Sequence, residues 1–308
     1  MLTRALAAIA ICPCAGIGGG VATELYFAHE RARRIGWWTL TVSVGPPLAP
    51  LVMGWVVDRA GPEWVFWVLA IVNFGQFLAY LTLNAESKYP EWHLTTSNND
   101  ETSMSVTKNQ SRLSFRRLND APWTLRELYS CFLVLRHLDV AVVIFTITIM
   151  FAFVNISMIL EIPSVLGEKF ELTGGQIGLQ CLGPIIGAFI GEQVEGPLSD
   201  LIIRQRFKCT GRRNYSNRLS LTYLAWPAAV AGTVIFYVQT QRAHHGQWNV
   251  TPLIGAGIAW FGSQIVLTTM ITFAVDSHRE VATDITLLSN VTRHVWAFVS
   301  SSTASLSC

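Results

Sequence analysis

Polar side chains recur at helical spacing inside an otherwise apolar stretch, residues 252–275. Trp260, Gln264, Thr268 and Thr272 follow one another in steps of four, which places them on one face of a helix. Polar groups cost free energy in hydrocarbon, so this face is expected to line a cavity or to contact a partner helix. Trp260 and Gln264 are the stronger candidates for lining a cavity, because interhelical hydrogen bonds alone would explain threonines.

A second apolar stretch, residues 139–162, carries Thr148 and Asn155 seven positions apart, again on a common helix face. Asn155 therefore joins the substrate-cavity candidates Trp260, Gln264 and Thr268. Hydrogen bonding between helices is the alternative interpretation of this amide.

Three carboxylates lie closest to hydrocarbon in the sequence: Glu161, Glu192 and Glu195. Burial disfavours the charged form of a carboxylate and so brings its titration towards the range that proton exchange needs. Glu161 and Glu192 are therefore candidates for proton coupling. The alternative is that each lies fully ionised among lipid headgroups.

The sequence contains none of the short patterns that mark common enzyme sites. GxSxG, HExxH and the phosphate-binding P-loop are all absent. Cys12 and Cys14 flank a proline, but no second Cys or His pair accompanies them, so packing is favoured over a metal site. The formal net charge of +2 does not indicate a nucleic-acid face. We expect no enzymatic activity, no cofactor, no metal and no nucleic-acid partner.

The elements that must position these side chains are membrane spans. Apolar residues make up 51% of the 308 residues, and charged residues make up only 14%. This charged fraction is far below the roughly 25% that is usual in soluble domains. The composition predicts an all-α, polytopic transmembrane helix bundle of about eight spans, each of ~20 residues, in a lipid bilayer. The final predicted span, residues 285–302, is the weakest candidate, because it carries Asn290, Arg293 and His294. The predicted spans are residues 5–23, 36–57, 64–83, 139–162, 174–195, 219–238, 252–275 and 285–302.

Basic residues predict the orientation of the spans. Alternate polar segments hold 17 Lys and Arg against 3, and these residues accumulate on the cytoplasmic side. The N-terminus is therefore expected outside or in the lumen. Residues 84–138, rich in Ser, Thr, Asn and charge, are expected to form a disordered cytoplasmic linker. It separates three spans in 1–83 from five in 139–302, followed by a tail at 303–308.

Small residues and prolines mark two further spans. Residues 45–54 read GPPLAPLVMG, which indicates either a simple kinked helix or a bend about which two halves of a bundle rock. Gly183, Gly187 and Gly191 recur every four residues and predict a tight helix contact. Asp200 and Arg204, also four apart, form either a solvated surface pair or a latch between helix ends.

Four segments, in this order, carry a resemblance to a known family: ELYFAHERARRIG, GPPLAPLVMGW, PEWVFWV and GQIGLQCLGPIIGAFIGEQVEGPLSD. Together they resemble fungal drug:proton antiporters of the major facilitator superfamily. That branch includes multidrug exporters and carriers of polyamines or cations. The resemblance places the chain between the family's fourth and eleventh helices, so it looks truncated. Departures include Glu24 for the usual Asp and Ala49 for a motif glycine.

The resemblance also implies roles for individual residues. Gly45, Pro46 and Gly54 match the antiporter motif, and Arg4 matches the fourth-helix arginine linked to proton coupling, although Ala8 replaces the glycine expected after it. The residues that match the cytoplasmic gating motif are Gly196, Ser199, Asp200 and Arg204.

We therefore expect a multi-pass transporter, in the plasma membrane, that moves a drug, polyamine or other cationic or amphipathic solute by alternating access, coupled to protons. No required protein partner is evident. A truncated chain that does not transport is one alternative. A seven-span receptor and a non-transporting membrane partner of an intact carrier are the others.

Overall fold

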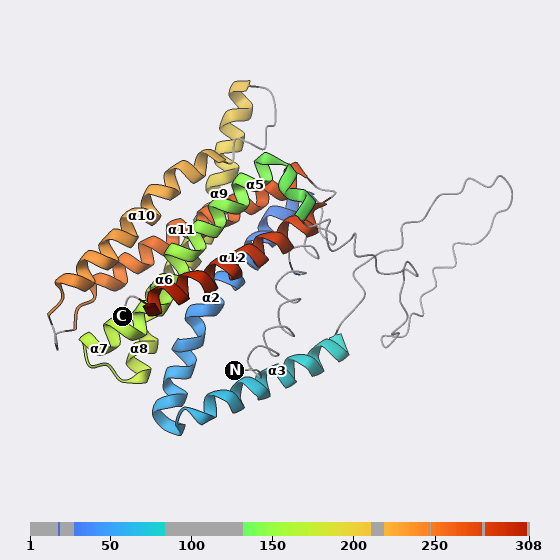
Figure 1. The fold of residues 1–308 in the computed structure, drawn as a ribbon. Coiled ribbons are helices and arrows are strands. Elements are labelled where there is room, and N and C mark those ends of the chain that lie inside the picture. Colours follow the sequence, from blue (N-terminus) through green and yellow to red (C-terminus); the bar gives the residue numbers. More distant parts are fainter. Residues whose placement is uncertain are drawn as a thin grey trace.

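The computed structural model describes residues 18, 28–83, 132–210, 219–244, 246, 248–278 and 281–306. Every regular element in these ranges is helical, as the sequence predicts (Figure 1). Their bounds are α2 Ala28–Ala60, α3 Glu63–Leu83, η1 Val134–Arg136, α5 Leu138–Met150, η2 Phe151–Ile156, α6 Ser157–Glu161, η3 Ile162–Leu166, α7 Gly167–Lys169, α8 Gly174–Gln180, α9 Leu182–Thr210, α10 Leu219–Arg242, α11 Thr251–Ser277 and α12 Ala282–Leu306.

Six helices of the described chain are long and apolar enough to cross a membrane. They comprise Arg33–Ala60, Glu63–Leu81, Leu138–Lys169, Gly174–Ser199, Leu219–Arg242 and Thr251–Ser277. Each coincides with an expected span. The first expected span, residues 5–23, and with it Arg4, lies outside the described residues apart from Gly18. The last becomes α12, a helix that does not reach the hydropathy of the six.

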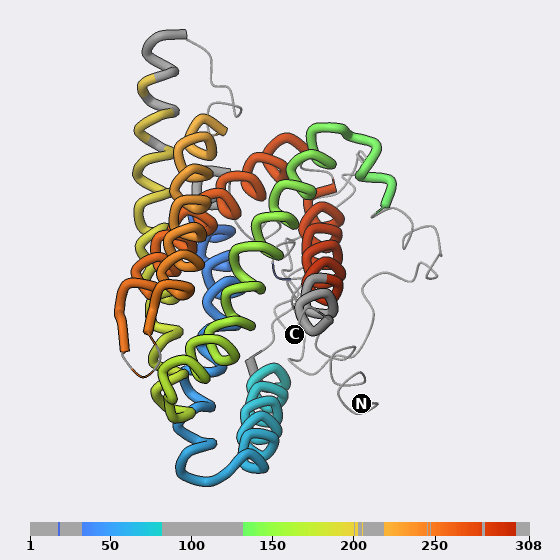
Figure 2. The backbone as a smooth tube through the Cα atoms, turned by 60° about the vertical axis from the view of Figure 1, so that its left-hand side comes forward, coloured from blue at the N-terminus to red at the C-terminus, as the bar shows by residue number. Residues whose placement is uncertain are grey.

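The centre of the bundle is α11, which lies between α9 and α10 (Figures 1 and 2). Small residues permit this close packing. A Cβ atom on Gly187 would lie 2.1 Å from the carbonyl oxygen of Gly257 in α11, and on Gly183 2.8 Å from that of Leu253. On the opposite side of α11, a Cβ on Gly232 of α10 would lie 2.3 Å from a backbone nitrogen. The tight contact predicted for the glycine stripe of α9 is confirmed.

The span from Leu138 to Lys169 is one rod with two wide π-helical turns. The turn η2 contains Asn155, and the second turn, η3, contains Pro163, which has no N–H to continue the α-helical ladder. α12 packs along α5 and η2. The linker expected over residues 84–138 lies mostly outside the described residues, but its end, from residue 132, is helical.

α2 packs against helices that follow residues 84–138 in the sequence. It contains Pro46, Pro47 and Pro50, whose missing N–H groups weaken its hydrogen-bond ladder, and Figure 1 shows it changing direction along its length. α2 packs against α8 and α9. α3 leads away from the bundle (Figure 1). Its apolar side chains are exposed, as those of a lipid-facing helix would be.

Candidate functional site

A carboxylate of α9 meets polar side chains of α11 at the junction with α2. Glu192 Oε2 accepts hydrogen bonds from Gln264 Nε2 at 2.9 Å and from Thr268 Oγ1 at 2.7 Å. Thr268 Oγ1 in turn lies 2.9 Å from Thr39 Oγ1 of α2. We call Glu192, Gln264, Thr268 and Thr39 the junction cluster. It joins three helices that are far apart in the sequence through hydrogen bonds alone.

Gly36 gives the junction cluster its room. A Cβ atom at this position would lie 1.9 Å from Glu192 Oε1, so any side chain here would displace the carboxylate. The backbone of Gly36 also takes part, because its carbonyl oxygen accepts a hydrogen bond from Thr39 Oγ1 at 2.8 Å. α2 thus contributes both a close backbone approach and a hydroxyl to the site.

The two threonines allow the hydrogen bonds to run in either direction, because each hydroxyl has one proton to donate. When Glu192 is ionised, Thr268 donates to the carboxylate and its oxygen can accept from Thr39. When Glu192 is protonated on Oε2, this O–H donates a hydrogen bond to Thr268. Thr268 then donates to Thr39, and Thr39 donates to the Gly36 carbonyl oxygen. The cluster can therefore pass the protonation state of Glu192 from α9 through α11 to α2.

The α11 face predicted from the spacing of four is buried. Trp260, Gln264 and Thr268 are each 1% exposed. Three of its polar atoms, Trp260 Nε1, Gln264 Oε1 and Thr272 Oγ1, have no hydrogen-bond partner among the described residues. An unpaired buried polar group costs about 1–3 kcal/mol. This face therefore retains unused capacity to bind a polar group or water.

Asn155 lies beside the same helix but on another side of it. Its Oδ1 accepts a hydrogen bond from Ser263 Oγ at 3.0 Å, and the asparagine is 1% exposed. Asn155 therefore joins the π-helical turn η2 to α11. Asn155 bonds to Ser263 of α11, whereas Gln264 of the same helix bonds to Glu192 of α9, so these two candidates take part in separate hydrogen bonds.

Glu161 lies away from the junction cluster. Its Oε1 accepts a hydrogen bond from the Tyr237 hydroxyl of α10 at 3.2 Å. Near the same end of α10, Lys169 Nζ donates to the backbone carbonyls of Thr240 and Gln241 at 2.6 and 3.1 Å. Cations are favourable at a helix C-terminus, where backbone carbonyls lack partners. Glu161 thus contacts α10 through Tyr237, and Lys169 makes the contact with the end of that helix.

The antiporter-motif residues lie along α2, and one of them packs on α8. A Cβ atom at Gly54 would lie 2.3 Å from the carbonyl oxygen of Gly174, whereas one at Gly45 would meet nothing within 4 Å. Pro46 is one of the three prolines inside α2. One turn after Gly54, Asp58 accepts hydrogen bonds from the backbone N–H groups of Gly174 and Gly175 at 3.0 and 2.7 Å.

The residues of the expected gating motif all lie on α9. Ser199 is buried at 4% exposure, and a Cβ atom at Gly196 would meet nothing within 4 Å. Asp200 and Arg204 belong to the same helix, but their side chains lie outside the described part of the chain. The latch predicted from their spacing of four stays a prediction.

Sequence reasoning missed Thr39, Gly36 and Ser263. Thr39 is a polar residue inside an expected span, which is the same signal that selected Thr268, but a single threonine forms no stripe. Gly36 is the first residue of that span and directly follows the basic segment. Ser263 precedes Gln264 and so lies off the stripe of four. Only the packing of α2 and η2 against α11 shows what these residues contact.

Comparison with known proteins identifies the family. A family model described as Major Facilitator Superfamily matches residues 1–301. The MFS-type transporter hepF of Aspergillus oryzae is 24% identical over 261 residues, which cover 85% of this chain and 52% of the relative. The probable efflux pump mfs2 of Aspergillus flavus is 23% identical, over 97% of this chain and 70% of its own length.

A third relative is the cycloheximide resistance protein of Candida maltosa, 24% identical over 90% of this chain and 50% of its own. The chain spans about half the length of several curated relatives that it matches. No solved structure matches it significantly. The family match and the six apolar helices make this an integral multi-pass membrane protein rather than a seven-span receptor. The chain belongs to the Major Facilitator Superfamily.

Proposed function

We propose that this protein moves a small solute across a membrane by alternating access, driven by proton exchange at Glu192. One observation carries the proposal: a carboxylate accepts two side-chain hydrogen bonds where α9 and α11 meet α2. In transporters of this architecture, solutes and coupling ions bind near the midplane, between repeats that rock against each other. The junction cluster lies between helices on either side of the long linker.

Proton exchange at Glu192 would act through the direction of the hydrogen bonds. When the carboxylate is ionised, the hydroxyl groups of Thr39 and Thr268 donate their hydrogen bonds in the direction of Glu192 on α9. When the carboxyl group is neutral, the same hydroxyl groups donate in the direction of the Gly36 carbonyl oxygen on α2. The two protonation states thus reverse the direction of the hydrogen bond that joins α11 to α2, and a proton biases a conformational equilibrium through a difference of this kind between the two states.

The chemistry of the site favours a solute that is cationic or amphipathic. Glu192 supplies negative charge, and Trp260 offers an indole, which attracts cations through its ring face and donates one hydrogen bond through Nε1. The unpaired Gln264 Oε1 adds an acceptor. Among the relatives, one is named an efflux pump and another a cycloheximide resistance protein. We propose a drug, polyamine or similar solute as substrate, with residence in the plasma membrane and the N-terminus outside.

Reconstitution tests this function. The full chain in proteoliposomes, with a proton gradient imposed, is expected to move radiolabelled spermidine or the cationic dye ethidium. Glu192→Gln is expected to abolish the dependence on the gradient, whereas Glu168→Gln, at an exposed position in α7, serves as the matched control. A flat trace for both probes from well-folded protein would contradict transport by this chain and favour a partner of an intact carrier.

A further inference from the structure

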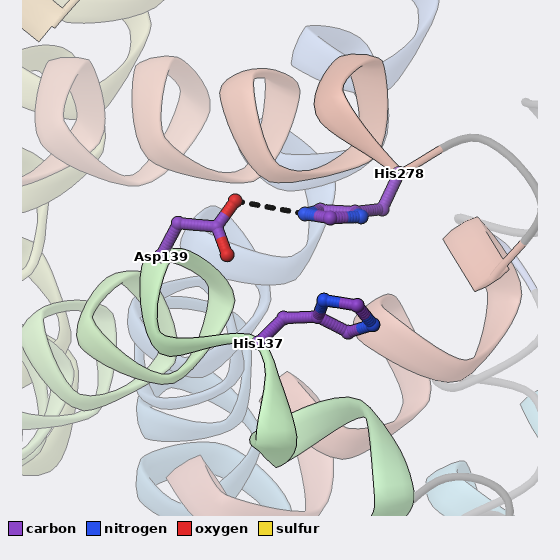
Figure 3. Close-up of side chains that lie close together, drawn as sticks. All are labelled: His137, Asp139 and His278. Atoms are coloured by element: carbon purple, nitrogen blue, oxygen red, sulfur yellow. Dashed lines mark hydrogen bonds and ion pairs between the residues drawn. The ribbon is translucent and has the colours of Figure 1, made fainter.

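Three metal-ligating side chains meet at the end of the bundle where α5 begins and α11 ends (Figure 3). His137 is the residue before α5, and Asp139 is the second residue within it. His278 follows the last residue of α11. These three residues, which we call the His–Asp–His cluster, come from segments about 140 positions apart, so only the fold brings them together.

The geometry of the His–Asp–His cluster is close to that of a metal site. One ligand atom from each residue lies within 4.8 Å of the other two. His278 Nε2 lies 2.8 Å from Asp139 Oδ2, and the two imidazole rings have centroids 4.5 Å apart. Around a tetrahedral ion with ligands at about 2.0–2.1 Å, neighbouring ligand atoms stand roughly 3.3 Å apart. Small side-chain rotations suffice to reach that spacing.

The backbone holds the three residues at the ends of helices. The N–H of His137 donates to Val134 O at 3.1 Å, which fixes the turn before α5, and the N–H of His278 donates to Ala274 O at 3.2 Å, which continues α11 by one residue. The side chains themselves remain accessible, since His137 and Asp139 are exposed and His278 is half-buried. An ion can therefore enter, and water can complete its coordination.

We propose that His137, Asp139 and His278 bind a divalent transition-metal ion such as Zn²⁺, with water as the remaining ligand. Two imidazoles and one carboxylate are ligands that Zn²⁺ accepts, and three protein ligands plus water make an open site. The bound ion replaces the hydrogen bond between Asp139 and His278 and ties the start of α5 to the end of α11. This site is separate from Glu192 and does not depend on transport.

Binding of Zn²⁺ to the tag-free full chain in detergent, measured by calorimetry, tests the proposal. Co²⁺ serves as a spectroscopic probe, because its visible absorption reports the ligand geometry. We expect one ion per chain in a site that is lost in His278→Ala and weakened at least tenfold in Asp139→Asn. His244→Ala is the matched control, an exposed histidine after α10 that is expected to leave binding unchanged.

Two results would overturn the site. Equal Zn²⁺ affinity in the wild-type chain and His278→Ala would mean adventitious binding to other histidines or cysteines only. No binding by wild-type protein would leave the cluster as a hydrogen-bonded pair beside a second ring. Circular dichroism of each variant in the absence of metal separates loss of the site from loss of the fold.

Discussion

The contact between α9 and α11 depends on Gly187, and its replacement by alanine offers a sharp test of the packing. The new Cβ atom would lie 2.1 Å from Gly257 O, 2.8 Å from Gly257 C and 3.0 Å from Gly257 Cα. All three are backbone atoms, so no side chain can rotate away. The two helices must move apart by about 1 Å to restore an ordinary contact, and a gap of that size forfeits roughly a quarter to a half of the local dispersion energy.

The expected cost follows from two opposing effects. Overfilling a packed interior costs about 1–3 kcal/mol, and the backbone clash places Gly187→Ala near the upper end. The higher helix propensity of alanine offsets about 1 kcal/mol of this loss in the free energy of unfolding. The net loss is therefore about 2 kcal/mol, which corresponds to a fall in melting temperature of about 4 °C for a chain of this size.

Thermal melting of the full chain in detergent, followed by far-UV circular dichroism, measures this change. Gly75→Ala is the matched control, because a Cβ atom at Gly75 in α3 would meet nothing within 4 Å. We expect this variant to melt at the wild-type temperature or slightly above it. If Gly187→Ala also melted at or above the wild-type temperature, the close approach of α9 to α11 would be refuted.

Two other features have testable consequences. Asp58→Asn removes the negative charge that two backbone N–H groups bind at the start of α8, so we expect a loss of about 1 kcal/mol in melting experiments, and unchanged stability would contradict a capping role. A glycosylation sequon inserted into residues 84–138 is expected to stay unmodified, because the distribution of basic residues predicts that this segment is cytoplasmic. Glycosylation at the inserted sequon would contradict the predicted orientation.

The helices were predictable because a membrane span leaves a strong signal of its own. A run of about 20 residues with almost no charge needs no knowledge of its neighbours, and the six apolar helices fall where these runs lie. The glycine stripe of α9 was predictable for a similar reason. Spacing of four fixes a helix face, and glycine on that face predicts close approach whatever the partner is.

The partners of the polar residues were not predictable, because periodicity identifies a face but not what lies against it. Thr39 and Thr268 are 229 positions apart, and Asn155 and Ser263 are 108 apart. Glu161 and Glu192 looked alike as carboxylates near hydrocarbon. The structure separates them by their hydrogen-bond donors, a tyrosine of α10 for Glu161 and two side chains of α11 for Glu192.

The His–Asp–His cluster shows the same limit of sequence patterns. His137 and Asp139 are two residues apart, but two ligands alone do not indicate a metal site. The third ligand, His278, comes from the far end of another helix. The π-helical turn around Asn155 likewise packs against α11 and α12, and no proline marks it in the sequence.

Solute exchange compared with gradient-driven uptake in proteoliposomes tests the central claim most directly, because it separates solute binding from proton coupling. Glutamine at position 192 keeps an oxygen that can accept from Gln264 and Thr268 but cannot exchange a proton. Glu192→Gln is therefore predicted to keep exchange of labelled solute across the membrane at zero gradient while losing at least tenfold of the uptake driven by the proton gradient. Gradient-driven uptake at the wild-type rate in Glu192→Gln would contradict the assignment of proton coupling to this residue.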